Sequence, residues 1–287
     1  MSKTWFITGT SRGFGRNITE LLLERGDRVA ATLRTPSRLD DLVERYGDQL
    51  WVRALDVSDT AQIREVVDAA FDQLGRIDVV LSNAGYGLFG AAEELSDEQI
   101  ERQLNTNVLG SIQLARAVIP HLREQGGGQL LQVSSLGGHV AFPGMSLYHA
   151  TKWALEGFYE ALAPELEPFG IRTTLIEPGA ARTDFGPASA DLARAMEVYA
   201  DTPAAAFIRG EGIPLEAMPG DPRKMAEAMI RVADLEDPPR RQLLGSDAVA
   251  MASAALSARL EAIDEQREIA LSTDADDYQP AAAGLQA

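Results

Sequence analysis

A tyrosine and a lysine four positions apart stand out in the stretch SLYHATKWA, residues 146–154. The chain has three lysines and six tyrosines among 287 residues, so about 0.06 such pairs are expected by chance. Tyr148 and Lys152 would share one face of a helix. Because an ammonium beside a phenol favours the phenolate, the pair predicts a pKa of Tyr148 below its usual value of about 10 and a side chain suited to acid–base chemistry.

Two adjacent serines, Ser134 and Ser135, end the apolar run LLQVSS. Successive side chains of a strand point to opposite faces, so only one of the two hydroxyls can enter a given site. A hydroxyl there would be a preorganised donor for an oxygen that gains charge. Taken alone, the tyrosine and lysine could also be a stacked pair on a solvated helix, and the nearby serine weakens that alternative.

A glycine-rich turn, TGTSRGFGR, follows the first apolar run and contains Gly9, Gly13 and Gly15. Glycines at a strand-to-helix turn let the backbone approach a pyrophosphate, and the helix N-terminus offers free N–H groups. The motif predicts a dinucleotide site, with an ordinary glycine-rich turn as the alternative.

The residue that would select between nicotinamide cofactors is not acidic here. An Asp or Glu at the end of the second strand would bind a ribose 2′-hydroxyl and repel a 2′-phosphate, whereas this strand ends in Leu33 followed by Arg34. Arg12 lies in the glycine loop, so two guanidiniums could bind a phosphate dianion. The sequence therefore predicts NADP(H), with NAD(H) as the second choice; the alternative is that both arginines are solvated surface charges.

Strand-like runs alternate along the chain with segments of helical period. The expected strands are TWFITG, RVAATL, LWVRALD, IDVVLSNAG, GQLLQVSS, IRTTLIEPG and RQLLG, and the expected helices cover 13–25, 37–46, 61–74, 97–124, 147–169 and 222–235. This alternation predicts a single doubly wound α/β domain of Rossmann type over residues 1–245, with about seven parallel strands and helices on both faces.

Three other segments have a different character. Residues 180–221 are rich in Gly and Pro and predict an irregular excursion that forms a lid or pocket wall. Residues 246–271 predict a C-terminal helix that packs on the body or on a partner. Residues 272–287 are expected to form a loose tail.

Composition narrows the classes of function. The chain has no cysteine, so disulfides, iron–sulfur clusters and thiolate zinc sites are excluded, and His121, His139 and His149 share no ligand-like spacing that would predict a metal site. A formal net charge of -17 disfavours binding to nucleic acid or an anionic membrane. The absence of a signal-like N-terminus and of a run of roughly 18 apolar residues predicts a cytoplasmic, soluble protein.

Taken together, TGxxxGxG, SNAG, YxxxK and EPGAART resemble the motifs of the short-chain dehydrogenase/reductase family, in the family's order, over residues 3 to about 245. The resemblance selects Ser135, thirteen residues before Tyr148, and implies the catalytic set Asn107, Ser135, Tyr148 and Lys152. The expected cofactor-binding residues are Gly9, Ser11, Arg12, Gly13, Phe14, Gly15, Arg34, Asp56, Val57, Asn83, Ala84, Gly85, Tyr148, Lys152, Pro178, Gly179 and Thr183.

The resemblance also implies a role for each catalytic residue. Tyr148 would donate a proton to a substrate carbonyl, Lys152 would also hold the nicotinamide ribose, and Ser135 would orient the substrate oxygen. Asn107 would support a water that links Lys152 to solvent, or it would only satisfy backbone groups at a helix kink. His149 stands where the family often has a small residue, and the sequence does not explain it.

Apolar and aromatic residues predict the substrate pocket. Its expected lining is Tyr86, His139, Phe142, Met145 and Phe185, so the non-reacting part of the substrate should be hydrophobic. The stretch SNAGYGLFGAAEE resembles the 17β-hydroxysteroid-dehydrogenase-like branch of the family, which does not identify a steroid as the substrate. The expected function is NADP(H)-dependent hydride transfer to or from a ketone, aldehyde or secondary alcohol, by a homodimer or homotetramer. The alternative is a non-catalytic NADP(H)-binding sensor or scaffold, which would not require Ser135, Tyr148 and Lys152 together.

Overall fold

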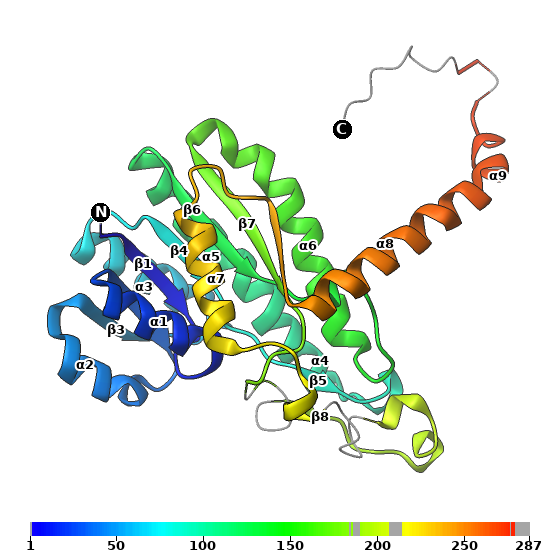
Figure 1. Ribbon diagram of the computed structural model, residues 1–287, viewed down its shortest axis with the longest axis horizontal. Coiled ribbons are helices and arrows are strands. Elements are labelled where there is room, and N and C mark those ends of the chain that lie inside the picture. Colours follow the sequence, from blue (N-terminus) through cyan, green and yellow to red (C-terminus); the bar gives the residue numbers. More distant parts are fainter. Residues whose placement is uncertain (1, 184, 186–189, 207–213, 276, 279–287) are drawn as a thin grey trace.

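Seven parallel strands form the central sheet, in the order β3, β2, β1, β4, β6, β7, β9 (Figure 1). They are β1 (Thr4–Thr8), β2 (Arg28–Leu33), β3 (Leu50–Ala54), β4 (Val79–Ser82), β6 (Gly128–Val133), β7 (Ile171–Pro178) and β9 (Arg241–Leu244). The computed structural model describes residues 2–183, 185, 190–206, 214–275, 277 and 278. The predicted Rossmann-type sheet is confirmed.

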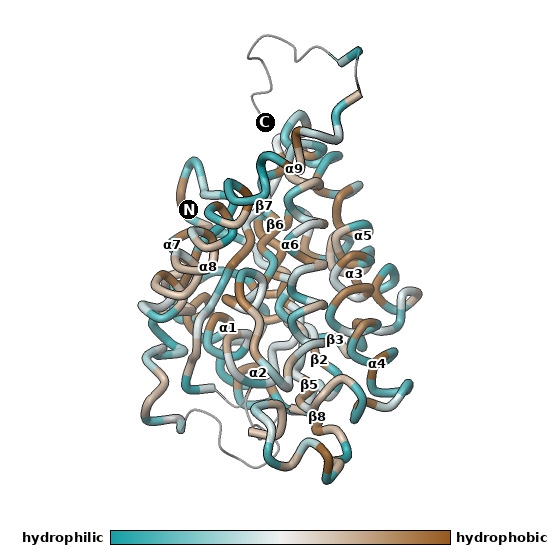
Figure 2. The backbone as a smooth tube through the Cα atoms, turned by 90° about the vertical axis from the view of Figure 1, so that its right-hand side faces the viewer, coloured by the Kyte–Doolittle hydropathy of each residue, from teal (hydrophilic) through white to brown (hydrophobic). Residues whose placement is uncertain are grey.

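Helices cover both faces of the sheet. They are α1 (Gly13–Arg25), α2 (Asp40–Tyr46) and α7 (Pro222–Asp234) on one face, and α3 (Thr60–Leu74), α5 (Gly110–Glu124) and α6 (Ser146–Leu166) on the other. Alternation along the strands supplies both cores: Trp5 and Ile7 of β1 pack under the first group, and Phe6 under the second. Figure 2 shows the apolar strands between helices whose outer turns are hydrophilic.

The single helix expected over 97–124 is divided into three parts. α4 (Asp97–Leu104) and α5 flank a π-helical turn over Asn105–Leu109. The end of this turn passes close to another loop, because a β-carbon on Gly110 would lie 2.6 Å from the carbonyl oxygen of Val57. The wider turn holds Asn107 in a buried position, and such π-bulges are frequent at functional sites.

The segment expected to be irregular contains one short strand among its described residues. β8 (Asp191–Leu192) pairs with β5 (Leu88–Phe89), which follows β4 along the chain. This pairing ties the segment to the loop after β4. Residues 184, 186–189 and 207–213 lie outside the described part of the chain.

The predicted C-terminal helix is present as α8 (Ser246–Glu265) and α9 (Arg267–Leu271). Its first turns pack on the body through Ala248 and Ala252, and the guanidinium of Arg259 reaches the carbonyl oxygen of His139 and the ring of Trp153. The end of the helix extends away from the sheet (Figure 1). Most of the expected tail, residues 276 and 279–287, lies outside the described residues. Among the described helices, none combines the length and the apolar character needed to span a bilayer.

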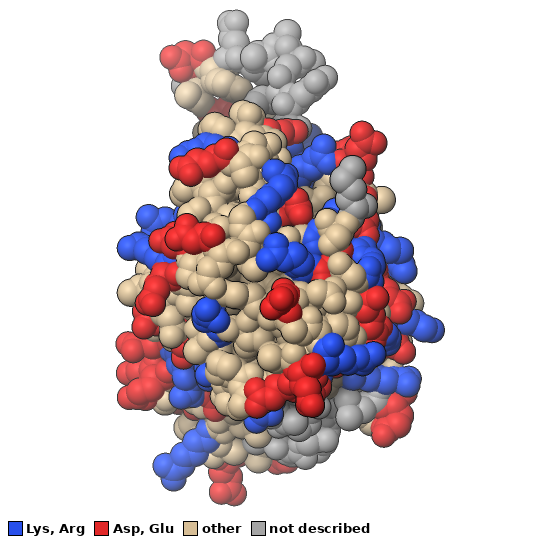
Figure 3. Space-filling model, turned by 90° about the vertical axis from the view of Figure 1, so that its left-hand side faces the viewer, with Lys and Arg blue, Asp and Glu red and all other residues tan. Residues whose placement is uncertain are grey.

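Acidic and basic side chains are interspersed on the face shown in Figure 3. Several ion pairs in the structure join separate elements: Lys3 and Arg25 both bind Asp234 at the end of α7, and Arg223 binds Glu24 of α1. These pairs link α7 to the N-terminal part of the chain, although exposed pairs of this kind contribute little to stability.

Candidate active site

The candidate site lies where the loops after β1, β4, β6 and β7 meet. All these strands are parallel, so their carboxyl ends share one edge of the sheet. The loops bring together Gly9, Asn83, Ser135 and Gly179 from distant parts of the sequence. α6 then runs past this edge and carries Tyr148 and Lys152.

Tyr148 and Lys152 are both buried, with 6% and 7% of their surfaces exposed. The Lys152 Nζ lies 5.7 Å from the centroid of the Tyr148 ring and donates a hydrogen bond of 3.1 Å to the carbonyl oxygen of Val133. Val133 is the last residue of β6, so the bond fastens the lysine to the end of the strand that leads to Ser135.

The predicted lowering of the Tyr148 pKa is wrong for this structure. Burial raises the pKa of Tyr148 to about 12, and a hydrogen bond with Ser135 only partly opposes this effect. Burial also lowers the pKa of Lys152 to about 8, against the opposing charge of Glu156. The cause is desolvation, because both side chains are buried and the charged form of each loses its hydration.

The two serines have different partners. Ser134 is buried and its Oγ donates to Glu156 Oε1, whereas the Ser135 Oγ accepts from the N–H of Gly137 at 2.9 Å and is hydrogen-bonded to Tyr148. Ser135 is therefore the serine next to the tyrosine. The side chain of Ser134 is instead bound to a carboxylate on the neighbouring helix α6.

Asn107 uses its amide on the loop after β4. Its Oδ1 accepts from the N–H of Tyr86 at 3.1 Å, and its Nδ2 donates to the carbonyl oxygen of Tyr86 at 2.9 Å and to Thr151 Oγ1 at 3.2 Å. These bonds match the backbone-satisfying role that the sequence left open. Thr151 belongs to α6 and directly precedes Lys152, so the bond to Thr151 also places Asn107 against that helix.

Two glycines of the loop, Gly9 and Gly15, are packed closely against backbone. A β-carbon on Gly15 would lie 2.3 Å from the carbonyl oxygen of Gly9, and one on Gly9 would lie 3.0 Å from the Cα of Ala84. Gly9 and Gly13 also have φ values of 72° and 56°, which favour glycine. Arg12, the residue before α1, makes no side-chain cap, so the first N–H groups of the helix are not satisfied by that residue and could bind an anion.

Arg12 and Arg34 are exposed, and neither guanidinium makes a hydrogen bond or an ion pair with the residues that the structure describes. Arg16, in the same region, is instead bound to Glu20 and Asp41. The pKa of Asp56 is lowered although burial opposes this, because Ser58 donates two hydrogen bonds to it and Arg34 is positively charged.

The other expected cofactor residues lie along the same edge. Asn83 mainly ties loops together, with its Nδ2 donating to the carbonyl oxygens of Thr8 and Gly9. Gly179 faces the start of α8, where Asp247 accepts from the N–H of Ala180. Ser11 and Phe14 belong to the glycine loop, Val57 follows β3, Ala84 and Gly85 follow β4, and Pro178 and Thr183 lie at the end of β7 and just beyond.

Apolar side chains surround the tyrosine. Tyr148 packs with Phe89, Met145 and Phe142, and the ring of Phe185 lies 5.6 Å from the tyrosine ring. Among the other expected lining residues, Tyr86 is held through its backbone by Asn107. The Nε2 of His139 lies 3.0 Å from Glu177 Oε2.

A buried ionic cluster behind the site is not evident from the sequence. Glu156 of α6 and Glu177 of β7 both accept from the guanidinium of Arg241, and His139 contacts Glu177. His139, Glu156 and Glu177 place ligand-type atoms within 4.8 Å of one another. The cluster already contains the cationic guanidinium, which compensates the carboxylates. No local spacing indicates it, because its members come from different elements.

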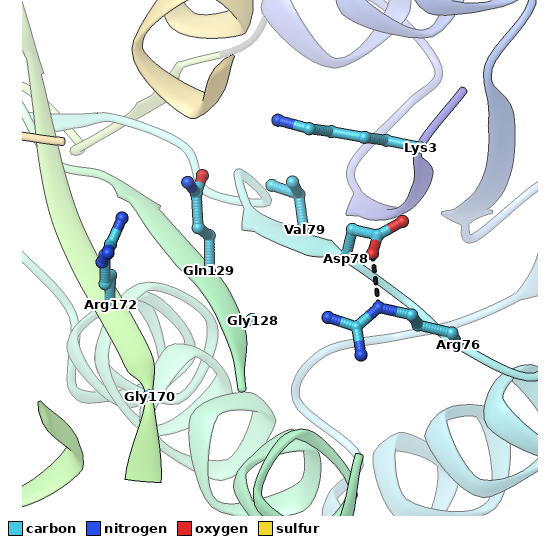
Figure 4. Close-up of a pocket in the computed structure, with 8 residues that line it drawn as sticks. All are labelled: Lys3, Arg76, Asp78, Val79, Gly128, Gln129, Gly170 and Arg172. Atoms are coloured by element: carbon cyan, nitrogen blue, oxygen red, sulfur yellow. Dashed lines mark hydrogen bonds and ion pairs between the residues drawn. The ribbon is translucent and has the colours of Figure 1, made fainter. Parts of the chain in front are cut away.

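A separate cavity of about 210 Å³ opens at the other edge of the sheet (Figure 4). It is lined by Lys3, Arg76, Asp78, Val79, Gly128, Gln129, Gly170 and Arg172. These residues lie at the amino ends of β1, β4, β6 and β7, and the Arg76 Nε donates to Asp78 Oδ1. The cavity is therefore not part of the candidate site.

Comparison with known proteins gives consistent matches. Residues 3–191 match the family model described as short chain dehydrogenase. Oxidoreductase BOA17 of Botryotinia fuckeliana is 40% identical over 275 residues, covering 95% of this chain and 100% of that protein. The 3-ketodihydrosphingosine reductase of Bacteroides thetaiotaomicron is 35% identical over 243 residues, covering 83% of this chain and 86% of that protein.

A solved structure extends the comparison to a cofactor complex. The alcohol dehydrogenase from the archaeon Thermococcus sibiricus, complexed with 5-hydroxy-NADP, superposes with a TM-score of 0.71 at 28% identity, covering 86% of this chain and 97% of that chain.

Proposed function

The chain belongs to the short chain dehydrogenase family and is an oxidoreductase of that type, and from this we propose that it reduces a ketone or aldehyde with NADPH, or oxidises the matching secondary alcohol. The observation that carries the proposal is the group of half-buried Ser135 with buried Tyr148 and Lys152 at the carboxyl edge of the sheet. A sensor or scaffold that only binds NADP(H) would not need this group.

Tyr148 is the proposed proton donor. Its raised pKa keeps the phenol protonated at neutral pH, which is the form required to deliver a proton to a carbonyl oxygen during reduction. Ser135 contacts the phenol and would donate a hydrogen bond to the same substrate oxygen. This donor is already in place before charge develops on that oxygen.

Lys152 is proposed to stabilise the phenolate that remains once the proton has left. Its ammonium is buried next to the tyrosine ring and, with a pKa of about 8, is mostly charged at neutral pH. An ammonium has three hydrogen-bond donors, and one of them binds Val133. The other donors could hold the nicotinamide ribose, as the family resemblance implies.

The residues at the carboxyl edge fit a dinucleotide. The close approach of Gly15 to Gly9 and the uncapped start of α1 suit a pyrophosphate. Arg12 and Arg34 would bind the 2′-phosphate of NADP(H). This preference is supported by the lack of partners for either guanidinium among the described residues, and by the NADP-type ligand named for the Thermococcus sibiricus structure. When bound, the cofactor supplies the hydride.

A hydrophobic substrate body is proposed from the surroundings of Tyr148. Phe89, Phe142, Met145 and Phe185 present apolar surface there, so removing an apolar group from water would contribute to binding. The name of the Bacteroides thetaiotaomicron relative, a ketone reductase, supports the ketone as the reacting group.

The test is NADPH oxidation followed at 340 nm with a panel of ketones, aldehydes and quinones of increasing apolar size. We expect carbonyl-dependent oxidation that is faster with NADPH than with NADH and improves with apolar chain length. Cofactor binding without turnover across the panel would instead favour the sensor or scaffold.

A further inference from the structure

We propose that His149 is a positioning residue: its imidazole clamps the segment from Gly137 to Phe142 and so fixes the hydroxyl of Ser135 next to Tyr148. The inference rests on the proposed function, because it concerns the same reaction. It accounts for an imidazole buried immediately after the proposed proton donor.

The ring of His149 is bonded at both nitrogens. Its Nδ1 lies 3.0 Å from the carbonyl oxygen of Gly137, and its Nε2 lies 3.0 Å from the backbone nitrogen of Phe142. A carbonyl oxygen can only accept and a backbone N–H can only donate, so the two bonds require a neutral ring with its proton on Nδ1. Burial, against the opposing bond to Gly137, lowers the pKa of His149, which agrees with a neutral ring.

One residue connects the imidazole to the serine hydroxyl. Gly137 receives the bond from His149 at its carbonyl and donates its own N–H to the Ser135 Oγ at 2.9 Å. The next residue, Gly138, donates to the carbonyl oxygen of Ser135. A shift of Gly137 would therefore change the position of the Ser135 Oγ, which accepts the hydrogen bond from the Gly137 N–H.

Gly137 and His149 also fit one another in shape. A β-carbon on Gly137 would lie 2.8 Å from the Nδ1 of His149, so the imidazole occupies the space that a side chain at position 137 would need. A small residue at position 149 would fill less of this space and would leave the carbonyl of Gly137 without the donor that His149 provides.

The other end of the clamp reaches the pocket wall. Phe142, whose N–H binds the ring, packs with Met145 and Tyr148, and its ring lies 5.5 Å from that of His149. Because His149 follows Tyr148 on α6, one helical turn carries both the proton donor and the residue that holds the serine loop against it.

The kinetic test compares His149→Leu, which cannot hydrogen bond, with His149→Gln, whose amide can both donate and accept. His149→Leu is expected to lower kcat by about 10- to 100-fold with the KM for NADPH within about 2-fold, and His149→Gln to recover most of the loss. His121→Gln is the control, because His121 pairs with Asp68 and stacks on Phe71 away from the site.

A double-mutant cycle separates positioning from a general loss of stability. In a Ser135→Ala background, His149→Leu should cost less than about 3-fold, since the hydroxyl that it positions is gone. A full additional loss, or a His149→Gln variant as slow as His149→Leu, overturns the proposal.

Hydrogen exchange tests, without any measurement of turnover, whether His149 holds the segment from Gly137 to Phe142 in place. Amides of 136–145 should exchange at least about 10-fold faster in His149→Leu than in the wild type, with β1 and β4 unchanged; equal exchange overturns the clamp. If wild-type protein oxidises no NADPH with any carbonyl, the proposed function fails while this result still stands. If His149→Leu does not fold, His149→Ser is measured in its place.

Discussion

The Nζ of Lys152 lies 5.7 Å from the centroid of the Tyr148 ring and donates a hydrogen bond to the carbonyl oxygen of Val133. Burial raises the pKa of Tyr148, so the phenol stays protonated, and it lowers the pKa of Lys152, because the charged ammonium is destabilised by the loss of its hydration. If Tyr148 is the proton donor proposed above, the protein holds this acid in its protonated form at a cost in stability, a trade common at active sites.

The loss of folding stability caused by burying Lys152 should be measurable. Lys152→Met is expected to raise the free energy of unfolding at pH 7 by about 1–3 kcal/mol, because an apolar side chain replaces a desolvated cation. The pKa of Lys152 falls from 10.5 to about 8 on folding, so between these pH values the unfolded chain binds more protons and the wild type gains stability as the pH rises.

The advantage of Lys152→Met should therefore shrink between pH 7 and pH 10 in urea unfolding. Lys224→Met, at an exposed lysine of α7, is the control and should change little at either pH. A Lys152→Met variant that is less stable than the wild type at pH 7 would refute this view of the lysine.

Cofactor preference should depend on Arg34. Arg34→Asp removes a guanidinium that makes no hydrogen bond or ion pair with the described residues and places a carboxylate near the expected 2′-phosphate. The ratio of kcat/KM for NADPH over NADH should therefore fall by about 10- to 100-fold. Arg64→Asp, the same change at an exposed position of α3, should leave the ratio unchanged. An unaltered ratio in Arg34→Asp would show that another group selects the cofactor.

The glycine loop should not tolerate even a methyl group at position 15. In Gly15→Ala the new carbon would lie 2.3 Å from the carbonyl oxygen of Gly9, so the loop must move, lowering stability by about 1–3 kcal/mol and weakening NADPH binding in a fluorescence titration. Gly157→Ala in α6, where a β-carbon meets nothing within 4 Å, should be neutral or stabilising by up to about 1 kcal/mol. Normal NADPH affinity in Gly15→Ala would argue against a pyrophosphate at this turn.

The parts of the fold that the sequence predicts well are those encoded locally. The strands of the sheet follow from apolar runs, and the proximity of Tyr148 to Lys152 follows from helical spacing alone. The π-helical turn at Asn105–Leu109 escapes prediction because its local sequence also suits a regular helix, and its conformation is accompanied by a close contact with Val57.

The electrostatics and the contacts of His149 depend on groups that are distant in the chain. The direction of the Tyr148 pKa shift is set by how deeply the fold buries the phenol, which the four-residue spacing does not reveal. The pairing of Glu156 with Glu177 and Arg241 likewise requires α6, β7 and β9 to be packed together. Sequence patterns thus identify the candidate residues, whereas burial determines their protonation.

The most direct test of the proposed proton transfer is the rate of NADPH oxidation by Tyr148→Phe with the best carbonyl substrate of the panel. Phenylalanine keeps the buried ring and removes only the acidic hydroxyl, so kcat should fall by about 10²- to 10⁴-fold while the affinity for NADPH stays within about 2-fold of the wild type. A Tyr148→Phe variant that turns over at the wild-type rate would contradict the assignment of Tyr148 as the proton donor.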